Sequence, residues 1–309
     1  MKPTARLREI MARPHATIAV SAHDPLLARL VEQAGFEVIG LSGNAVAASY
    51  LGLPDMGFLN LSDMANVARR IAAAVRIPVL VDADTGYGNA MAVQRTVREL
   101  EQAGVAGIII EDQIDYKKCG MIKTAHPVVP AEEHAAKVRA ACLARTDPDF
   151  VICARTDAAA DHGLDEAIRR GFMYVEAGAD MLDVEVVGTP DEVEKIARAK
   201  LPVPLKGNMD EGKKLWLNPL PVLSEAGYKV ASYPGLVRYT VVRAVREALA
   251  HLKAHGSSVG FENRLATVEE YFGAVDLEGY LELERRIFAD GHSREDGNPG
   301  RTGSPPARA

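Results

Sequence analysis

The stretch Val79-Leu-Val-Asp-Ala-Asp-Thr-Gly-Tyr-Gly-Asn89 begins as a short apolar strand and ends in two carboxylates and a glycine-rich turn. The next apolar run, Ile108-Ile-Ile-Glu-Asp-Gln113, has the same design. A strand that is apolar until its carboxyl end, and acidic there, builds a hydrophobic wall beneath a hydrated, negatively charged mouth. Such a mouth suits a hard cation such as Mg²⁺, which is held by one or two carboxylates and several waters.

Eight apolar runs alternate with amphipathic segments along the 309 residues. Several of the amphipathic segments end in Ala-Gly, a usual stop signal of a helix. Eight such units at this chain length predict a (β/α)₈ TIM barrel rather than an open doubly wound sheet, and no Gly-x-Gly-x-x-Gly follows the first strand. The expected strands are Thr17–Ser21, Glu37–Ser42, Pro78–Asp84, Gly107–Asp112, Phe150–Arg155, Met181–Glu185, Val203–Asn208 and Tyr228–Tyr233. The expected helices are Leu26–Ala34, Asp63–Val75, Ala90–Ala103, Glu132–Ala144, Leu164–Ala177, Pro190–Ala199, Pro219–Ala226, Leu236–His255, Val268–Phe272 and Leu277–Phe288.

The chain is predicted to have three parts. The catalytic barrel spans 1–255 and includes an extra leading helix at 3–12. Residues 256–290 form a C-terminal helical extension, which we expect to cover the barrel or to reach a neighbouring subunit. The segment 291–309 is rich in Gly, Pro, Ser and Arg, a composition typical of a disordered tail.

The composition narrows the class of protein. Hydrophobic residues make up 48% of the chain but aromatic residues only 6%, which fits a core of Ala, Val and Ile around buried parallel strands. The net charge of −6 does not favour nucleic-acid binding, and no apolar run approaches the roughly 20 residues of a membrane span. Met1–Arg13 lacks the apolar core of a signal peptide, and three cysteines give no disulfide framework. We therefore expect a reduced, cytoplasmic enzyme with a small-molecule substrate.

In a barrel of this kind the carboxyl ends of the strands share one face, and the active site lies there. We expect the carboxylates on that face to hold a divalent ion and Arg155 to form a bidentate pair with a substrate carboxylate. The backbone N–H groups of Ser42-Gly43-Asn44 could bind another anionic oxygen. The strand ends deliver Ser21, His23, Asp24, Ser42, Gly43, Asn44, Asp82, Asp84, Glu111, Asp112, Arg155, Thr156, Asp157, Glu185, Lys206, Asn208 and Tyr233.

Some of these acidic residues have a simpler explanation. Asp24, Asp112 and Asp157 each precede or open a turn, so capping would account for them. Capping does not account for Asp82 and Asp84, because residues two apart at a strand end share a face. Their mutual repulsion would be costly there without a cation.

The connection after the fourth strand, 112–130, is longer than the usual βα loop and predicts a mobile active-site lid. It carries Cys119 beside two lysines, and adjacent lysines lower the pKa of a thiol. An ordinary surface cysteine on a basic loop would look the same, so this motif does not decide the function by itself. Cys142 and Cys153 fit packing positions.

Six motifs together resemble the isocitrate lyase/phosphoenolpyruvate mutase superfamily, in particular its branch of 2-methylisocitrate lyases and carboxyphosphonoenolpyruvate mutases. The likeness runs from about Ala16 to about His255. The motifs are Leu51-Gly-Leu-Pro-Asp55, Asp82-Ala-Asp-Thr-Gly-Tyr-Gly-Asn89, Ile110-Glu-Asp-Gln113, Lys117-Lys-Cys-Gly120, Ala154-Arg-Thr-Asp-Ala158 and Asn208-Met209.

The resemblance implies a barrel whose last helix swaps between subunits of a homotetramer, a dimer of dimers. It implies Mg²⁺, with Mn²⁺ as the alternative, bound mainly by Asp84, with Asp82 and Glu111 acting through waters. A 2-oxo or 2-hydroxy carboxylate would sit on the metal, and Cys119 would exchange a proton with the leaving succinate-like fragment. The implied substrate-binding residues are Ser42, Gly43, Asn44, Asp55, Arg155 and Asn208. The implied catalytic residues are Cys119, Lys117, Arg155 and Glu185.

Three positions depart from the lyase pattern. Met121 stands where His is usual, His23 replaces a Tyr, and Glu211-Gly-Lys-Lys-Leu-Trp216 replaces Glu-Gly-Gly-Lys-Thr-Pro near the substrate's distal carboxylates. These departures leave the metal and core residues in place but leave the substrate open.

The function we expect is Mg²⁺-dependent carbon–carbon cleavage of a 2-hydroxy di- or tricarboxylate resembling 2-methylisocitrate or 2,3-dimethylmalate, with release of a 2-oxoacid such as pyruvate. Oxaloacetate decarboxylation or hydrolysis is one alternative, and phosphorus–carbon mutase chemistry is another. A non-catalytic binding barrel is a third, but the Asp82, Asp84, Glu111 and Arg155 set argues against it.

Overall fold

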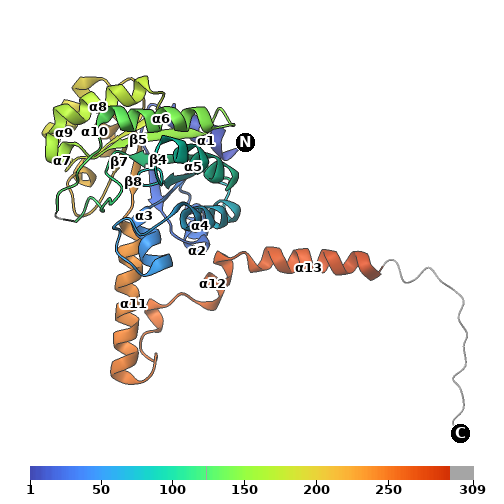
Figure 1. The fold of residues 1–309 in the computed structure, drawn as a ribbon. Helices are drawn as coiled ribbons and strands as arrows, with labels where there is room; N and C mark the ends of the chain where they lie inside the picture. Colours follow the sequence, from blue (N-terminus) through green and yellow to red (C-terminus); the bar gives the residue numbers. More distant parts are fainter. Residues whose placement is uncertain (123, 293–309) are drawn as a thin grey trace, which may run out of the picture. The chain divides into compact units, whose positions relative to one another are not determined.

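Eight parallel strands close into a barrel in chain order, with β8 paired to β1, which confirms the predicted fold (Figure 1). The computed structural model describes residues 1–122 and 124–292. Each predicted strand overlaps an observed one, and the bounds of the first and the last agree to the residue. The strands are β1 (Thr17–Ser21), β2 (Val38–Leu41), β3 (Val79–Asp82), β4 (Gly107–Glu111), β5 (Val151–Thr156), β6 (Met181–Val184), β7 (Leu205–Asn208) and β8 (Tyr228–Tyr233).

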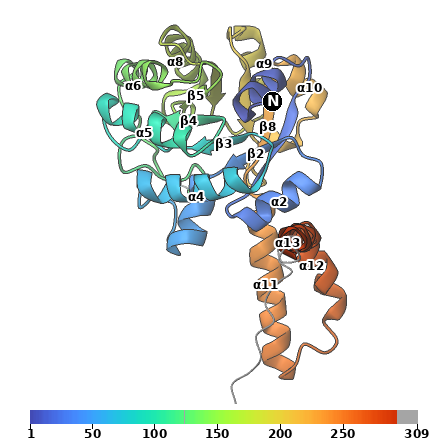
Figure 2. The same ribbon diagram turned by 90° about the vertical axis from the view of Figure 1, so that its right-hand side faces the viewer.

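Helices surround the barrel, as two perpendicular views show (Figures 1 and 2). Helix α4 begins two residues before the predicted Asp63, because Asn60 caps it and forms a capping box with Asp63. No helix in the described part of the chain is long and apolar enough to span a membrane. The main helices of the barrel unit are α1 (Pro3–Met11), α2 (Pro25–Gln33), α4 (Leu61–Ala74), α5 (Ala90–Gln102), α6 (Ala131–Ala144), α8 (Leu164–Glu176), α9 (Pro190–Ala199), α10 (Leu220–Glu225) and α11 (Leu236–His255).

Four short helical segments follow the carboxyl ends of strands and were not expected from the sequence. They have four residues or so each, which is too short to show a hydrophobic period. All of them lie in loops at the end of the barrel where the site was predicted. They are α3 (Gly43–Val46), the π-helix η1 (Ala47–Leu51), α7 (Ala159–His162) and the 3₁₀-helix η2 (Leu215–Leu217).

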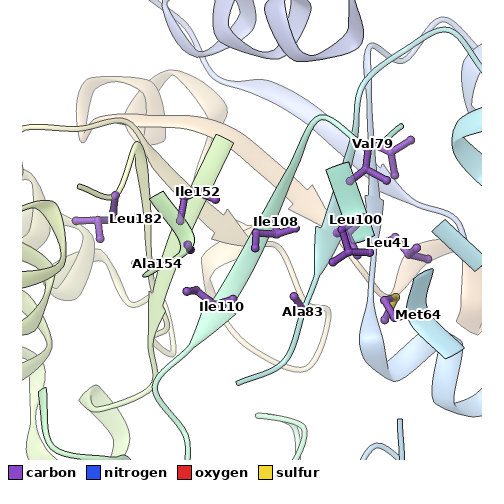
Figure 3. Packing of buried hydrophobic residues seen from close by; sticks show 14 of the residues in the cluster. Leu41, Met64, Val79, Ala83, Leu100, Ile108, Ile110, Ile152, Ala154 and Leu182 are labelled. Carbon is purple, nitrogen blue, oxygen red and sulfur yellow. The ribbon is translucent and has the colours of Figure 1, made fainter. Parts of the chain in front are cut away.

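The core has two parts. Between the barrel and its helices, outward-facing strand residues such as Ile108, Ile110 and Ile152 pack against apolar helix residues (Figure 3). Inside the barrel, Leu7 and Ile10 of α1 join the inward-facing strand residues in a second cluster. Helix α1 therefore closes one end of the barrel, and the strands' carboxyl ends form the other.

By its internal contacts the chain separates into two units, Met1–Ser257 and Ser258–Ala309. The second unit contains the 3₁₀-helix η3 (Glu262–Arg264), α12 (Val268–Ala274) and α13 (Leu277–His292). The predicted domain bounds stay predictions, and 293–309 of the predicted disordered tail lies outside the described residues.

His134 of α6 is fully buried and packs edge-to-face on Tyr174, with 4.6 Å between ring centroids. Burial lowers the pKa of His134 to about 3, and the nearby charges of Lys137 and Arg170 add to this effect. The ring is therefore neutral in the folded state at pH 5, whereas an unfolded chain protonates it near pH 6.5. Between these two pKa values the unfolded state binds the extra proton, so stability falls as the pH falls.

We predict that His134→Phe will weaken this acid sensitivity. Lowering the pH from 7 to 5 reduces the unfolding free energy, and this reduction should be about 2 kcal/mol smaller in the variant than in the wild type. The difference arises because the pH passes through about 1.5 units below the pKa of an unfolded histidine. Urea unfolding at the two pH values measures the difference. His15→Phe, at an exposed histidine, is the control. Equal losses in the His134 variant and the wild type would contradict the prediction.

Candidate functional site

A cavity of about 70 Å³ lies at the carboxyl ends of the strands, as predicted. Most of the site residues expected from the sequence line it. Gly43 and Asp84 do not line it, but both lie directly behind Asp82, because a Cβ on Gly43 would be 3.1 Å from Asp82 Oδ2 and 2.9 Å from Asp84 Oδ1. The expected residues that line the cavity are Ser42, Asn44, Asp55, Asp82, Glu111, Lys117, Cys119, Arg155, Glu185 and Asn208.

The carboxylates of Asp82, Asp84 and Glu111 meet at the ends of β3 and β4. Asp82 accepts backbone N–H bonds from Gly43 and Asp84, each at 3.1 Å. The chain then turns through Asp84 with φ at +50°, so the two aspartates do not simply follow one strand face. The N–H of Gly43 is engaged by Asp82. The anion site expected at Ser42-Gly43-Asn44 therefore cannot use that donor.

The pKa values of these carboxyl groups are shifted in different directions, because the nearby cations offset the effect of burial to different extents. Burial raises the pKa of Asp84, and the charges of Asp82 and Asp55 raise it further. Burial also raises the pKa of Glu111. Burial would raise the pKa of Asp82 too, but Lys117 and Arg155 outweigh it, so this pKa is lowered. Asp84 and Glu111 therefore hold a proton more tightly than free carboxyl groups do, whereas Asp82 gives one up more readily.

Lys117 is the cation at the centre of this cluster. Its Nζ lies 2.6 Å from Asp84 Oδ1, 2.9 Å from Asp55 Oδ1 and 4.0 Å from Glu111 Oε1. The side chain is 4% exposed. Burial alone would lower the pKa of Lys117, but the carboxylates around it raise the pKa well above its usual value. Lys117 thus carries a fixed positive charge from the loop into the carboxylate cluster.

The carboxylate cluster fits a hydrated cation better than a directly caged one. In residues 1–122 and 124–292, no three His, Cys, Asp or Glu side chains are grouped so that they could hold a metal directly. Glu111 Oε1 and Asp84 Oδ1 are buried oxygens without a hydrogen bond within this part of the chain, although Asp84 Oδ1 is ion-paired with Lys117. Mg²⁺ keeps several waters and needs one or two carboxylates, so it matches such a site.

Arg155 is paired within the chain. Its Nε and Nη2 bond to the two carboxylate oxygens of Asp157 at 2.9 and 2.7 Å. This edge is therefore already occupied, and the expected pairing of Arg155 with a substrate carboxylate stays a prediction. A substrate would have to meet the Nη1 side. Capping does not explain Asp157 either, because its carboxylate orients Arg155.

Asp24 and Asp112 are the other two acidic residues for which the sequence suggested capping of a turn, and they have different roles in the structure. Asp24 caps α2 by accepting from the N–H of Leu27 at 2.8 Å, as expected. Asp112 is fully buried and joins the strand ends to the helices, because it accepts from Thr156 and Tyr174 at 2.7 Å and from Arg170 at 3.0 Å. This network supports the loop that follows β5.

Glu185 is held from three sides. Its Oε2 accepts from Asn208 Nδ2 at 2.8 Å and lies 3.9 Å from Arg155 Nη2, while Oε1 is ion-paired with Lys213. Burial alone would raise the pKa of Glu185, but Arg155 and Lys213 outweigh it, so this pKa is lowered. Glu185 therefore stays ionised while it faces the cavity.

The loop 112–130 covers the cavity, apart from Lys123, which is outside the described residues. A bridge between Gln113 and Val128 closes its base. The Gln113 side chain bonds to the backbone of Lys118, and the N–H of Cys119 donates to the carbonyl of Asp55 at 3.1 Å. These contacts place Cys119 over the cavity, while the predicted mobility of the loop stays a prediction.

The lowered thiol pKa expected for Cys119 is wrong, because burial raises it. The neighbouring Lys117 turns its ammonium to Asp55 and Asp84 instead of the thiol. Asn44 Nδ2 donates to Sγ at 2.9 Å, which fixes the position of the sulfur. The structure therefore presents Cys119 as a positioned thiol and not as a reactive thiolate.

Two departures from the lyase pattern lie in contact. Met121 packs so closely on Gly212 that a Cβ there would overlap its Cε. A Cβ on Gly120 would lie 3.5 Å from Lys213 Nζ and 3.7 Å from Glu185 Oε1. The Gly120–Met121 part of the loop thus rests on the Gly212–Lys213 turn, and a side chain at position 212 would force the end of the Met121 side chain to move.

Asp210 and Arg238 also line the cavity and were missed by the sequence analysis. Arg238 Nη2 lies 3.5 Å from Asp210 Oδ1. Arg238 sits in the first turn of α11, which we had interpreted only as a barrel helix. Its place just after β8, at the catalytic end of a barrel, is a signal that would have found it.

We predict that Lys213→Met will loosen the loop. The variant removes the Lys213 charge beneath Gly120. Limited tryptic cleavage after Lys118 should then be roughly tenfold faster. A tenfold change corresponds to about 1.4 kcal/mol, a typical value for a charged hydrogen bond. Lys214→Met is the matched control, because Lys214 is adjacent and exposed. If both variants are cleaved at the wild-type rate, the turn does not hold the loop.

Comparison with known proteins places this geometry in a family. The family model described as phosphoenolpyruvate phosphomutase matches residues 7–253. A probable 2-methylisocitrate lyase of Corynebacterium glutamicum is 40% identical, covering 90% of each chain. The 2,3-dimethylmalate lyase of Eubacterium barkeri is 37% identical, covering 92% of this chain and 98% of that one. A structure of phosphonopyruvate hydrolase with oxalate and Mg²⁺ has a TM-score of 0.83 at 33% identity, covering 93% of this chain and 100% of that one.

Proposed function

The chain belongs to the phosphoenolpyruvate mutase/isocitrate lyase superfamily, and on that premise we propose that it cleaves a carbon–carbon bond of a 2-hydroxy di- or tricarboxylate with the help of Mg²⁺. As a member it is an enzyme of the lyase and mutase type. The proposed substrate resembles 2-methylisocitrate or 2,3-dimethylmalate. The proposed product is a 2-oxoacid such as pyruvate.

One observation carries this proposal. The Asp82, Asp84 and Glu111 carboxylates meet under a loop that holds the Cys119 thiol over the same cavity. A cation site and a proton donor beside one cavity would serve bond cleavage between two carboxylate-bearing fragments. The cation would stabilise the charge on the first fragment, and the donor would protonate the second.

The metal site is proposed at Asp84, with Asp82 and Glu111 acting through waters and Mn²⁺ as the alternative ion. When bound, Mg²⁺ would act as a Lewis acid toward negative charge that develops on the substrate oxygen. Lys117 holds Asp84 and Asp55 in place through its ion pairs. Asp82 is oriented by the N–H groups of Gly43 and Asp84.

Arg155, Glu185 and Asn208 are proposed to orient the substrate. Asp157 fixes the plane of the Arg155 guanidinium, and Asn208 fixes Glu185. Ser42 and Asn44 line the same wall. A carboxylate at the Nη1 side of Arg155 would gain a charge-assisted hydrogen bond.

Cys119 is proposed as the acid that protonates the departing fragment. A thiol whose pKa is raised by burial stays protonated at neutral pH, which is the state an acid needs. Asn44 holds the sulfur, and the loop residues around Cys119 line the cavity. Oxaloacetate decarboxylation or hydrolysis and mutase chemistry stay as alternatives, because the presence of the thiol does not exclude them.

The proposed partner is a second copy of the chain in a helix-swapped homotetramer. Helix α11 has no buried residue in the single chain, and several of its apolar side chains are exposed. These exposed residues are Leu236, Tyr239, Val242, Val245, Leu249 and Leu252. The cytoplasmic location stays a prediction.

The metal prediction concerns Asp84→Ala. In the wild type, Mg²⁺ at about 100 times its dissociation constant should add about 2.7 kcal/mol of stability, because it binds only the folded state. The variant should lose this gain and all activity. Thermal shift with and without Mg²⁺ measures it, and Asp115→Ala on the exposed part of the loop is the control. Unchanged Mg²⁺ stabilisation in the Asp84 variant would refute the assignment.

The cysteine prediction concerns Cys119→Ser. The variant should lose about 10²–10⁴-fold in cleavage rate, because it lacks the proton donor. It should still bind Mg²⁺ and pyruvate, since neither needs the thiol. A screen of 2,3-dimethylmalate, 2-methylisocitrate, oxaloacetate and phosphonopyruvate for 2-oxoacid release identifies the substrate, and Cys142→Ser is the control. Near-full turnover of the Cys119 variant would favour a decarboxylase or mutase mechanism.

A further inference from the structure

The inside of the barrel contains a buried ion pair just below the catalytic layer. Asp183 of β6 and Lys206 of β7 are neighbours across the two strands, and Lys206 Nζ bonds to Asp183 Oδ2 at 2.6 Å. The Asp183 side chain is 1% exposed and that of Lys206 is 5% exposed. Barrel interiors are normally filled by bulky apolar side chains, so a charged pair is unusual at this position.

Stability does not explain such a pair. Taking two charges out of water costs several kcal/mol each, and well-packed apolar residues of similar volume often serve a fold as well or better. The site itself offers a different explanation, because Lys206 lines the active-site cavity. The ammonium is thus buried in the protein but open to a bound ligand.

The hydrogen-bonding capacity of Lys206 is not exhausted by its protein contacts. Among the described residues, its Nζ donates to Asp183 Oδ2 and to Asn208 Oδ1, the latter at 2.7 Å. A protonated lysine has three N–H donors. One donor therefore remains for the cavity. The bond to Asn208 also ties this lysine to Glu185, which Asn208 holds from the other side.

The rest of the cavity lining inside the barrel mixes polar and apolar side chains, because Leu80, Ile109 and Val230 line it together with two serines. Ser21 and Ser232 line it, and a Cβ on Gly40 would lie 3.2 Å from Ser232 Oγ and 3.9 Å from Ser21 Oγ. The missing side chain of Gly40 leaves room between β1, β2 and β8. Ala19, a small residue, lines the same floor. Among these apolar side chains the floor offers open space, one ammonium and two hydroxyls, of which that of Ser21 already donates to the carbonyl of Gly40 at 2.9 Å.

We propose that this floor, formed by Lys206, Ser232, Ser21 and Gly40, is a subsite for an oxygen-bearing substituent of the substrate fragment held above it. The substituent accepts a hydrogen bond from Lys206 and is either a hydroxyl or a carboxylate. This inference rests on the proposed function, because that function puts a 2-oxoacid fragment at the strand ends. It changes one detail of that function: the released 2-oxoacid is an analogue of pyruvate with a polar group in place of the methyl, and the substrate is the corresponding analogue of 2-methylisocitrate or 2,3-dimethylmalate.

The physical reason is a desolvation cost. A methyl group against the floor would shield the Lys206 donor and the Ser232 hydroxyl from water without replacing their hydrogen bonds. A site built to bond an oxygen rejects an analogue that lacks it much more strongly than an apolar pocket rejects an extra methyl. The floor therefore favours a fragment with an oxygen at this position over pyruvate, which has a methyl there.

The test measures how tightly the Mg²⁺-loaded full chain binds three small 2-oxoacids. Pyruvate has a methyl, hydroxypyruvate a hydroxymethyl and ketomalonate a carboxylate at the position in question, so the last two separate a hydroxyl from a carboxylate. Isothermal titration should show at least one of the two binding about tenfold or more tightly than pyruvate, as expected for a hydrogen bond to a charged group. Oxalate, which has no such substituent, reports on the metal and carboxylate contacts alone.

The double variant Asp183→Leu/Lys206→Met tests the residues. It removes both charges together, because removing one would leave the other buried and unpaired. The preference over pyruvate should disappear, while oxalate should bind as in the wild type. Ser232→Ala leaves the ion pair intact, so it serves if the double variant does not fold, and it should weaken the preference several-fold. Lys195→Met, at a surface lysine paired with Asp165, is the control.

The outcomes separate the two proposals. Oxalate binding without any preference among the three 2-oxoacids would overturn the floor subsite and leave the proposed function standing. The same holds if the double variant, or Ser232→Ala in its place, keeps the full preference. If oxalate fails to bind in the presence of Mg²⁺, both proposals are overturned, because the fragment would not be held above the floor at all.

Discussion

The burial of several carboxylates at one end of the barrel is the constraint on which the rest of the site depends. Asp55, Asp82, Asp84 and Glu111 lie close enough to raise one another's electrostatic cost, and burial removes the water that would screen them. The compensating positive charge is that of Lys117, which belongs to the loop 112–130 and not to a strand of the barrel. The charge that makes the cluster tolerable is therefore carried by the segment that covers it, so loop position and cluster electrostatics are coupled.

The same principle extends across the strands' carboxyl ends. Glu185 is matched by Lys213, Asp183 by Lys206, and Asp157 by Arg155. The first two pairs join different elements, so these charges also set the relative positions of strands and loops, whereas Arg155 and Asp157 lie two residues apart at the end of β5. The proposed substrate with several carboxylates would enter a site in which positive and negative side chains already alternate. Its anionic groups would have to replace those of the protein, so its recognition would depend on fixed partners such as Asn208.

The apolar packing around the barrel allows charged side chains to be buried at the carboxyl ends of the strands. Outward-facing residues of the strands pack against the helices, and α1 closes the opposite end of the barrel. The apolar contacts that stabilise the fold are thus made by the outward-facing side of each strand and by the end of the barrel that α1 closes. The interior near the mouth is free to contain polar groups. The ion pair of Asp183 and Lys206 shows how far that freedom reaches into the barrel.

The strand pattern, the Ala-Gly helix ends and the acidic strand ends were readable from the sequence, because each depends on residues close together in the chain. The barrel and the set of site residues followed, since parallel strands bring their carboxyl ends to one face. The partners of those residues did not follow. Whether Lys117 faces Cys119 or Asp84, whether Arg155 is already paired with Asp157, and which side chains face Lys206 depend on contacts between distant segments. Burial and charge at those contacts, which only the tertiary structure decides, turned the expected thiolate of Cys119 into a protonated thiol.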